Sequence, residues 1–282
     1  MIRSARPGDE IALTHLWQTV FGDREADIAR FLSALYRPEI TTVWAEGDQI
    51  RSAVYLVDAG ISPLPDGRRL PTAYLYAFAT LPDYQGRGIG TQVIRTAIAG
   101  GFDHGFRCNI LRPAEASLFP YYARLGYGTS GAVAQGRATL ENRAFSTPGA
   151  QVMSTNFSTY LAIRNQYLPP FSTEYADSFL QYVALTAQVC GGGLYRLDMN
   201  GQSGCAVAEI RGEELFIREI LLPPPLLTQG VQALLAHFEK SAATYRTPTE
   251  LAPAQSAPFI LAAFPPGENI PLELGYFPFV LD

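Results

Sequence analysis

The chain has 282 residues, a net charge of −5 and 48% hydrophobic residues. A chain of this length suits two domains or one large domain, and its composition is typical of a globular protein with a sizeable core. The negative net charge argues against nucleic acid as a partner. No apolar run is long enough to span a bilayer, and the first residues lack the apolar segment of a secretory signal, so we expect no membrane contact.

Cysteine and histidine are scarce. The three cysteines form no C-x-x-C pair, and the three histidines lie far apart in the sequence. These patterns disfavour a zinc site and a disulfide framework, because both need closely or regularly spaced ligands or partners. We therefore expect a cytoplasmic protein without a bound metal.

Charge is distributed unevenly along the chain. Residues 1–145 hold fifteen arginines against fourteen acidic residues, a net charge of +1, whereas residues 146–282 hold six basic residues against twelve acidic ones, a net charge of −6. A near-neutral half that is rich in arginine can hold an anionic ligand, and an acidic half can attract a cationic one. Ordinary solvated surfaces would give the same asymmetry, so both interpretations stay open.

The spacing of apolar residues predicts the elements of the first half in chain order. They are helices over 9–20 and 25–35, strands over 41–45, 51–57 and 73–80, a helix over 88–99, a strand over 106–111 and a helical stretch over 114–124, in which Pro120 marks a break or a late start.

Residues 146–150, which read STPGA, are the best candidate for a linker. Beyond them the same criteria predict helices over 157–165 and 175–189, strands over 194–199, 205–210 and 215–222, and a helix over 226–240. The order of elements in the second half repeats that of the first. We therefore predict a structural repeat.

The most informative stretch runs from Phe78 to Thr91, where a strand ends, a glycine-rich loop follows and a helix begins. Backbone N–H groups at a helix start have no intrahelical partner, and the helix dipole adds partial positive charge, so such a site suits a phosphate or pyrophosphate. Glycines in the loop let the backbone approach the anion closely, and the side chain of Arg87 can add a contact.

Three patterns of phosphate-binding loop compete for this stretch. The P-loop requires a lysine that is missing here, and the dinucleotide fingerprint requires G-x-G-x-x-G with an acid about 20 residues later, where Asn109 and Ile110 stand. The pattern Q/R-x-x-G-x-G/A is matched in full by residues 85–90, which read QGRGIG. With Pro82 upstream and a helix downstream, this segment resembles the pyrophosphate loop of the GCN5-related N-acetyltransferase (GNAT) superfamily. An ordinary glycine-rich turn is the alternative.

The resemblance implies acetyl-CoA as the cofactor and transfer of its acetyl group to an amine. In that family the strand before the loop diverges from its neighbour, and the pantetheine arm of the cofactor pairs with the exposed backbone. By position, the residues implied to bind the cofactor are Phe78, Ala79, Thr80, Gln85, Gly86, Arg87, Gly88, Ile89, Gly90 and Thr91.

A second match lies at residues 121–127, YYARLGY, which resemble the F-Y-x-x-L-G-F segment of the same family. By position, Tyr122 is implied to be the general acid that protonates the departing thiolate. A phenol of pKa ~10 can donate to a thiolate whose parent thiol has a pKa near ~8.5–10, and such help is worth about 10²–10⁴ in rate. The alternative is that Tyr122 only packs against its aromatic neighbours. The family often has Asn seven residues earlier, where Glu115 stands here.

The general base is less evident. An ammonium of pKa ~10.4 lies about three units above neutral pH, so a base should assist its deprotonation. Many relatives carry Glu on the fourth strand, but residues 73–78, AYLYAF, contain no acid. The segment at 121–127 and the second half without a loop motif resemble the "enhanced intracellular survival" type of acetyltransferase, which has two such domains and a third domain, and uses its C-terminal carboxylate as base. The chain is too short for the third domain. The resemblance implies Asp282 as the base.

Together these features predict an α+β fold of tandem GNAT-like domains, each with a mixed, mostly antiparallel central sheet flanked by helices. Residues 1–145 would hold the acyl-CoA site, and residues 146–282 would form a degenerate partner. In place of a phosphate loop the second half has PPPLLTQG, whose prolines offer no N–H, so we expect one cofactor site. We expect the second half to help form the acceptor pocket. The candidate contributors are Glu209, Glu214 and Glu219, with solvent-exposed strand ends as the alternative for each.

The expected function is therefore an N-acetyltransferase that moves an acetyl group from acetyl-CoA to a primary amine of a small, cationic acceptor. The alternative is a non-catalytic acyl-CoA-binding or regulatory protein on the same fold, because a fold alone does not establish activity. A dinucleotide oxidoreductase would require NAD(P) binding. The identity of the amine substrate, the acyl group and formation of a homo-oligomer all stay open.

Overall fold

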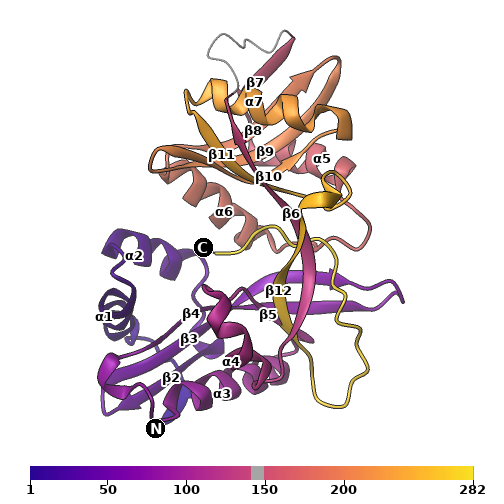
Figure 1. Cartoon of the computed structure of the whole chain (residues 1–282). Coiled ribbons are helices and arrows are strands. Elements are labelled where there is room, and N and C mark those ends of the chain that lie inside the picture. The colour runs from indigo at the N-terminus through magenta and orange to yellow at the C-terminus, as the bar shows by residue number, and fades with distance from the viewer. Residues whose placement is uncertain (141–148, 282) are drawn as a thin grey trace.

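The computed structural model describes residues 1–140 and 149–281, which build a twelve-stranded sheet flanked by helices (Figure 1). The elements of the first half are β1 (Ile2–Ser4), α1 (Glu10–Phe21), α2 (Glu25–Ala34), β2 (Thr41–Glu46), β3 (Gln49–Pro63), β4 (Arg69–Thr80), α3 (Ile89–Asp103), β5 (Cys108–Leu111), α4 (Phe119–Ala123) and β6 (Gly128–Thr139). The elements of the second half are β7 (Ala150–Ser154), α5 (Phe157–Tyr167), α6 (Asp177–Val189), β8 (Gly193–Met199), β9 (Gln202–Arg211), β10 (Glu214–Leu221), α7 (Leu227–His237), β11 (Ala242–Thr247) and β12 (Ser256–Ala263).

Both halves follow the same order of elements, so the predicted repeat is confirmed. The strands lie in the order β1-β2-β3-β4-β5-β12-β6-β11-β10-β9-β8-β7. Among the described strands, β4 with β5 and β10 with β11 form the parallel pairs, and the remaining neighbours are antiparallel. The α+β fold with a mixed, mostly antiparallel sheet is therefore also confirmed.

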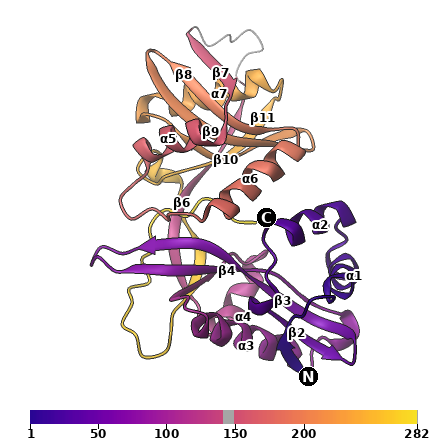
Figure 2. The ribbon, with the colours of Figure 1, turned by 180° about the vertical axis from the view of Figure 1, so that it is seen from behind.

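The two halves exchange strands. β12, the last strand of the second half, pairs with β5 of the first half, and β6, the last strand of the first half, pairs with β11 of the second half. β12 and β6 also pair with each other, so the sheet runs without interruption from one lobe of the molecule to the other (Figures 1 and 2). The predicted boundary between residues 145 and 146 lies outside the described residues. The lobes in space therefore do not coincide with the ranges 1–145 and 146–282.

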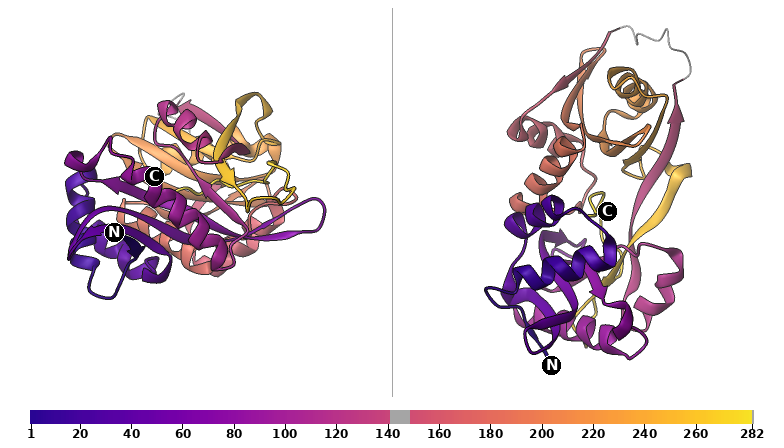
Figure 3. Two further views of the ribbon diagram at one scale, coloured as in Figure 1. Left: turned by 90° about the horizontal axis from the view of Figure 1, so that it is seen from below. Right: turned by 90° about the vertical axis from the view of Figure 1, so that its left-hand side faces the viewer.

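After β12 the chain turns back and its last described residues lie between the two lobes (Figure 3). Residues 276–281, which we call the terminal segment, have no regular secondary structure, yet all six are buried. The ring of Phe277 stacks on that of Tyr74 in β4, with centroids 6.3 Å apart and planes inclined by 9°. The terminal segment thus joins the core of the first lobe although it is the most distant part of the sequence.

The helices and long strands match the predictions, with differences at their ends. β3 and β4 extend beyond the predicted strands to form a long hairpin, because their outer parts pair with each other from Ser62↔Leu70 onward. The predicted helix over 114–124 is shorter, since a 3₁₀ turn at Ala116–Leu118 precedes α4. Pro120 lies in the first turn of α4, which confirms the late start among the two predicted alternatives. In the part of the chain that the structure describes, no helix is long and apolar enough to cross a membrane.

Candidate active site

The loop that follows β4 owes its shape to glycine. Gly86 and Gly88 have φ angles of +72° and +76°, a region that other residues rarely adopt. A Cβ at either position would meet no atom within 4 Å, so the requirement there is conformational. Gly90 differs, because a Cβ would lie 2.5 Å from Cζ of Phe78 and 3.3 Å from Oγ1 of Thr80. Gly90 is therefore needed for the close approach of α3 to β4.

The start of α3 presents backbone amides to this loop. The first intrahelical hydrogen bond runs from the Gln92 N–H to the Gly88 carbonyl at 3.1 Å, and no side chain caps the helix. The preceding amides of the first turn therefore lack an acceptor within the helix. The Gln85 side-chain amide donates to the Thr80 carbonyl at 2.9 Å and fastens the loop to the end of β4. An anion placed here would receive amide hydrogen bonds and the positive end of the helix dipole.

Arg87 lies at the rim of this loop. Its guanidinium carbon is 5.3 Å from the ring centroid of Tyr84, and that of Arg51 is 5.1 Å from the same ring. The Tyr84 hydroxyl donates to a carboxylate oxygen of Glu46 at 2.8 Å. Two cations are thus held beside the loop by one aromatic ring, a position from which either can approach a phosphate.

β4 and β5 separate beside the loop. Their parallel pairing joins residues 72–74 to residues 108–110 and then ends, although β4 continues to Thr80. A bulge lies in the same part of β4, where Ala77 has a φ of +46° and the register with β3 shifts between Ala53 and Tyr55. The ladder between β4 and β5 therefore stops at the pair Tyr74↔Ile110, beside the loop.

A cavity of about 360 Å³ adjoins the loop. Eight of the residues predicted to bind the cofactor line it, namely Phe78, Thr80, Gln85, Gly86, Gly88, Ile89, Gly90 and Thr91. Ala79 and Arg87 do not line it; Ala79 is buried, and its carbonyl accepts a hydrogen bond from the Ser52 hydroxyl at 2.8 Å. The sequence analysis missed Val20, Tyr84 and Tyr121, which complete the wall.

A second cavity, of about 690 Å³, has largely aromatic walls. Its aromatic residues are Trp17, Phe21, Tyr74, Tyr76, Phe78, Tyr121 and Tyr122. Phe78 and Tyr121 line both cavities, which places the two side by side. Leu281 of the terminal segment lines the second cavity as well, and it is the one described residue of the second half that does so.

Tyr122 is buried in the wall of the second cavity and is 8% exposed. Its ring packs edge to face against those of Tyr121 and Tyr127, with centroid distances of 5.2 and 5.8 Å. Burial, reinforced by the neighbouring Tyr121, raises the pKa of the Tyr122 hydroxyl to about 12. The group is therefore protonated at neutral pH and can act as a hydrogen-bond donor.

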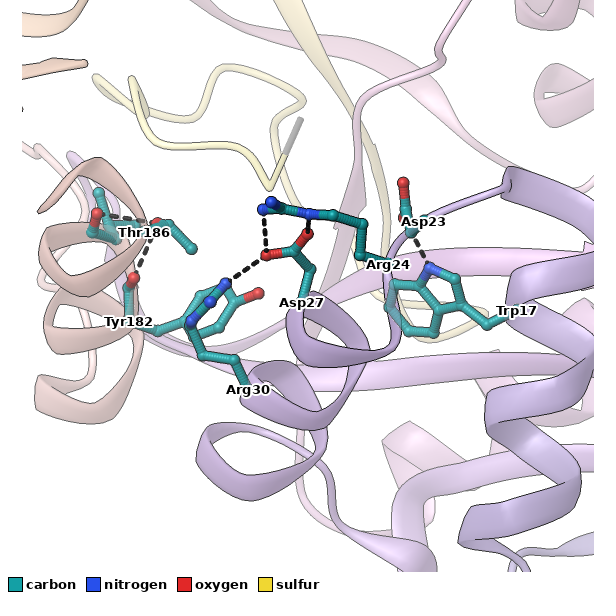
Figure 4. Close-up of polar contacts among 8 residues, drawn as sticks. Trp17, Asp23, Arg24, Asp27, Arg30, Tyr182 and Thr186 are labelled. Atoms are coloured by element: carbon teal, nitrogen blue, oxygen red, sulfur yellow. Dashed lines mark hydrogen bonds and ion pairs between the residues drawn. The ribbon is translucent and has the colours of Figure 1, made fainter. Parts of the chain in front are cut away.

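Asp23 is the one acid among the described residues that line the second cavity. It is exposed in the turn between α1 and α2, and the indole N–H of Trp17 donates to its carboxylate at 2.8 Å (Figure 4). Arg112 also lines the cavity, but its guanidinium carbon lies 4.1 Å above the ring of Phe259. The sequence analysis missed Asp23, and its position in the turn between two predicted helices was the available signal.

The predicted acids of the second half have other roles. Glu219 pairs with Arg164 at 2.8 Å, and both side chains are almost completely buried. Glu209 is buried between Arg211 at 2.7 Å and Arg218 at 2.6 Å.

None of the three glutamates lines the second cavity. Glu214 pairs with Arg137 in a partly exposed ion pair. The alternative of a solvent-exposed strand end is wrong for Glu209 and Glu219, because β9 and β10 lie inside the sheet with both faces covered. Asp282, the predicted base, lies outside the described residues.

The chain is similar to known acetyltransferases in the sequence of its first half and in its fold. Residues 1–130 match the family model described as the acetyltransferase (GNAT) domain. No curated protein matches the chain significantly. A GCN5-related N-acetyltransferase from Kribbella flavida is 15% identical, with a TM-score of 0.70 over 94% of this chain and 71% of that one. A probable N-acyltransferase from Enterococcus faecalis is 15% identical, with a TM-score of 0.67 over 94% of this chain and 72% of that one.

Eis1 from Mycobacterium abscessus also has this fold, with 15% identity and a TM-score of 0.62 over 94% of this chain and 73% of that one. Residues 1–130 of the chain thus match the model of the GNAT acetyltransferase domain, and the chain shares the fold of these acetyltransferase structures. The resemblance drawn from residues 85–90 and 121–127 is confirmed. The likeness to Eis1 is consistent with the expected "enhanced intracellular survival" type.

Proposed function

We propose that the protein transfers an acetyl group from acetyl-CoA to a primary amine of a small, cationic acceptor. The supporting observation is that Phe78 and Tyr121 line both the cavity at the phosphate loop and the aromatic cavity. A cofactor whose diphosphate lies on the amides of residues 85–90 could follow the open edge of β4. Its thioester would then reach the cavity that contains Tyr122.

The reaction that suits this arrangement is direct transfer. The neutral amine attacks the thioester carbon, the tetrahedral intermediate breaks its C–S bond, and the products are an N-acetyl amine and coenzyme A. The Tyr122 hydroxyl donates a hydrogen bond to the developing thiolate and passes its proton to the sulfur as it leaves. Because the pKa of Tyr122 is raised to about 12, its hydroxyl keeps its proton until negative charge develops on the sulfur. The ammonium that forms on attack releases its proton to the base, and Tyr122 regains one from solvent.

The base in this proposal is Asp282. Its neighbour Leu281 lines the cavity that contains Tyr122, so the chain reaches this site at least as far as residue 281. Deletion of Leu281 and Asp282 should greatly reduce turnover and leave coenzyme A binding intact, because Leu281 does not line the phosphate-loop cavity. Full activity of the truncated protein would refute the role of this end of the chain.

The acceptor cavity favours a cation with an apolar body. Its aromatic faces attract ammonium groups, and Asp23 at the rim supplies a negative charge. Polyamines, aminoglycosides, amino acids and the amino groups of peptides all carry the required primary amine, and a panel of these compounds would rank them.

The decisive experiment measures thiol release from acetyl-CoA with this panel for wild type, Tyr122→Phe and Tyr121→Phe. The first substitution removes the hydroxyl proposed as general acid, and the second removes a neighbouring hydroxyl as a matched control. We expect Tyr122→Phe to lower kcat by about 10²–10⁴ with unchanged coenzyme A affinity. Tight binding of coenzyme A without turnover of any amine would instead favour a non-catalytic acyl-CoA-binding protein.

A further inference from the structure

Buried polar groups of the second half hold the backbone of the terminal segment. Arg218 donates from Nη1 to the Val280 carbonyl at 3.1 Å, and Arg246 donates from Nη1 to the Pro278 carbonyl at 3.2 Å. Between these two bonds, the Phe279 N–H donates to the Tyr175 hydroxyl at 3.0 Å. Both arginines and Tyr175 are buried. Three consecutive residues of the terminal segment are thus held by side chains from β10, from β11 and from the connection between α5 and α6.

A hydrogen bond to Glu209 fixes the orientation of the Arg218 side chain. Its Nε donates to Glu209 at 2.6 Å, and the side chains of Arg218 and Glu209 are 6% and 2% exposed. Replacing a buried pair of this kind by apolar residues is often neutral or stabilising, so stability alone does not explain it. The planar guanidinium has donors that point in different directions, and here one serves Glu209 while another serves Val280.

Aromatic packing extends these contacts to the acceptor cavity. The ring of Tyr175 lies 5.0 Å from that of Phe277 and 5.4 Å from that of Phe279. Phe277 in turn stacks on Tyr74, which lines the acceptor cavity, and Leu281 lines the same cavity directly. The terminal segment therefore connects buried groups of the second half with the cavity that contains Tyr122.

We propose that the second half contributes to transfer through this contact, and that Arg218, Arg246 and Tyr175 are positioning residues that hold the terminal segment so that Leu281 stays in the wall of the acceptor cavity. This inference rests on the proposed function. A loosened segment would widen the cavity on the side of Leu281 and misplace the amine relative to the thioester. Binding of coenzyme A would not change, since no residue of the terminal segment lines the phosphate-loop cavity.

The test compares two substitutions that each delete one buried hydroxyl from the second half. Tyr175→Phe removes the acceptor of the Phe279 N–H and keeps the ring. Tyr160→Phe is the matched control, because its hydroxyl donates to Glu219 at 2.5 Å and has no hydrogen bond to the terminal segment. We expect Tyr175→Phe to lower kcat/KM for the amine by about tenfold, the equivalent of one buried hydrogen bond, with a change of less than about twofold in the Kd of coenzyme A.

Arg218→Lys extends the test, because lysine keeps the positive charge beside Glu209 but cannot serve both acceptors with one ammonium group. It should show the same split between amine kinetics and coenzyme A affinity. In parallel, hydrogen exchange of the amides of residues 277–281 should accelerate in Tyr175→Phe and not in Tyr160→Phe.

Several results would overturn the proposal. Equal losses of amine kinetics in Tyr175→Phe and Tyr160→Phe would show a general effect of destabilisation. Wild-type kinetics in Tyr175→Phe despite faster exchange at residues 277–281 would remove the positioning role and leave the proposed function standing. A wild-type protein that binds coenzyme A but acetylates no amine would defeat the proposed function itself, and this inference with it.

Discussion

Replacement of Gly90 by alanine tests whether the close contact between α3 and β4 shapes the cofactor site. The added methyl carbon would lie 2.5 Å from Cζ of Phe78, more than 1 Å inside the usual contact distance of about 3.5–4.0 Å. The backbone of Gly90 is not in the left-handed region, so the strain arises from the side chain alone. Overpacking of this kind costs about 1–3 kcal/mol. Because Phe78 lines both cavities, the displaced ring would enter the space in which the cofactor is proposed to bind.

We therefore expect Gly90→Ala to weaken coenzyme A binding by about 5- to 150-fold, as measured by calorimetric titration. A second substitution, Phe78→Leu, would remove the obstructing ring edge, so the double variant should recover part of the lost affinity. The cycle of single and double variants separates this coupling from independent effects. The reasoning would be refuted if folded Gly90→Ala bound coenzyme A as tightly as the wild type. It would also be refuted if the losses of coenzyme A affinity in the two single variants simply added in the double variant.

Three further predictions follow from single contacts. Gly88→Ala meets no neighbour but keeps a φ of +76°, so it should cost about 1–2 kcal/mol in thermal unfolding and leave Phe78 in place; an unchanged midpoint would contradict this. Tyr122, with its raised pKa, contributes to the stability of the fold below pH ~10, and this contribution is lost as pH rises through about 12. An alkaline decline of kcat that is absent in Tyr122→Phe should therefore centre near pH 12 and not near pH 10. Arg164→Met leaves Glu219 buried without its cation and should destabilise the protein by about 3–5 kcal/mol in urea unfolding, whereas Arg164→Met with Glu219→Leu should recover most of the loss.

Local sequence patterns were sufficient to predict the cofactor loop. The conformations at residues 85–90 depend on glycines and on the junction of a strand with a helix, and these signals lie within fourteen residues from Phe78 to Thr91. The same is true of Tyr122, whose place in the aromatic cavity follows from the short helix α4 and its neighbours. Most helices were predictable because their apolar spacing decides which face is buried.

The sequence did not predict the strand exchange or the wall of the acceptor cavity. β6 contains three glycines and several alanines, so its strand propensity is low, and its conformation depends on pairing with β11 and β12 far away in the sequence. Asp23 and Leu281 line the same cavity although about 260 residues separate them in the sequence, and no local pattern predicts that two such distant residues line one cavity. The burial of Glu209 and Glu219 was equally hidden, since charged residues on strands are usually exposed.

The exchange of β6 and β12 also determines when the first lobe can be complete during synthesis. The edge of β5 pairs with residues 261–263, so on the ribosome it stays open until about 150 further residues have emerged. An open strand edge is a template for pairing with other chains. During that interval the nascent protein is exposed to such pairing, so its dependence on chaperones should exceed that of a relative whose first domain closes its own sheet.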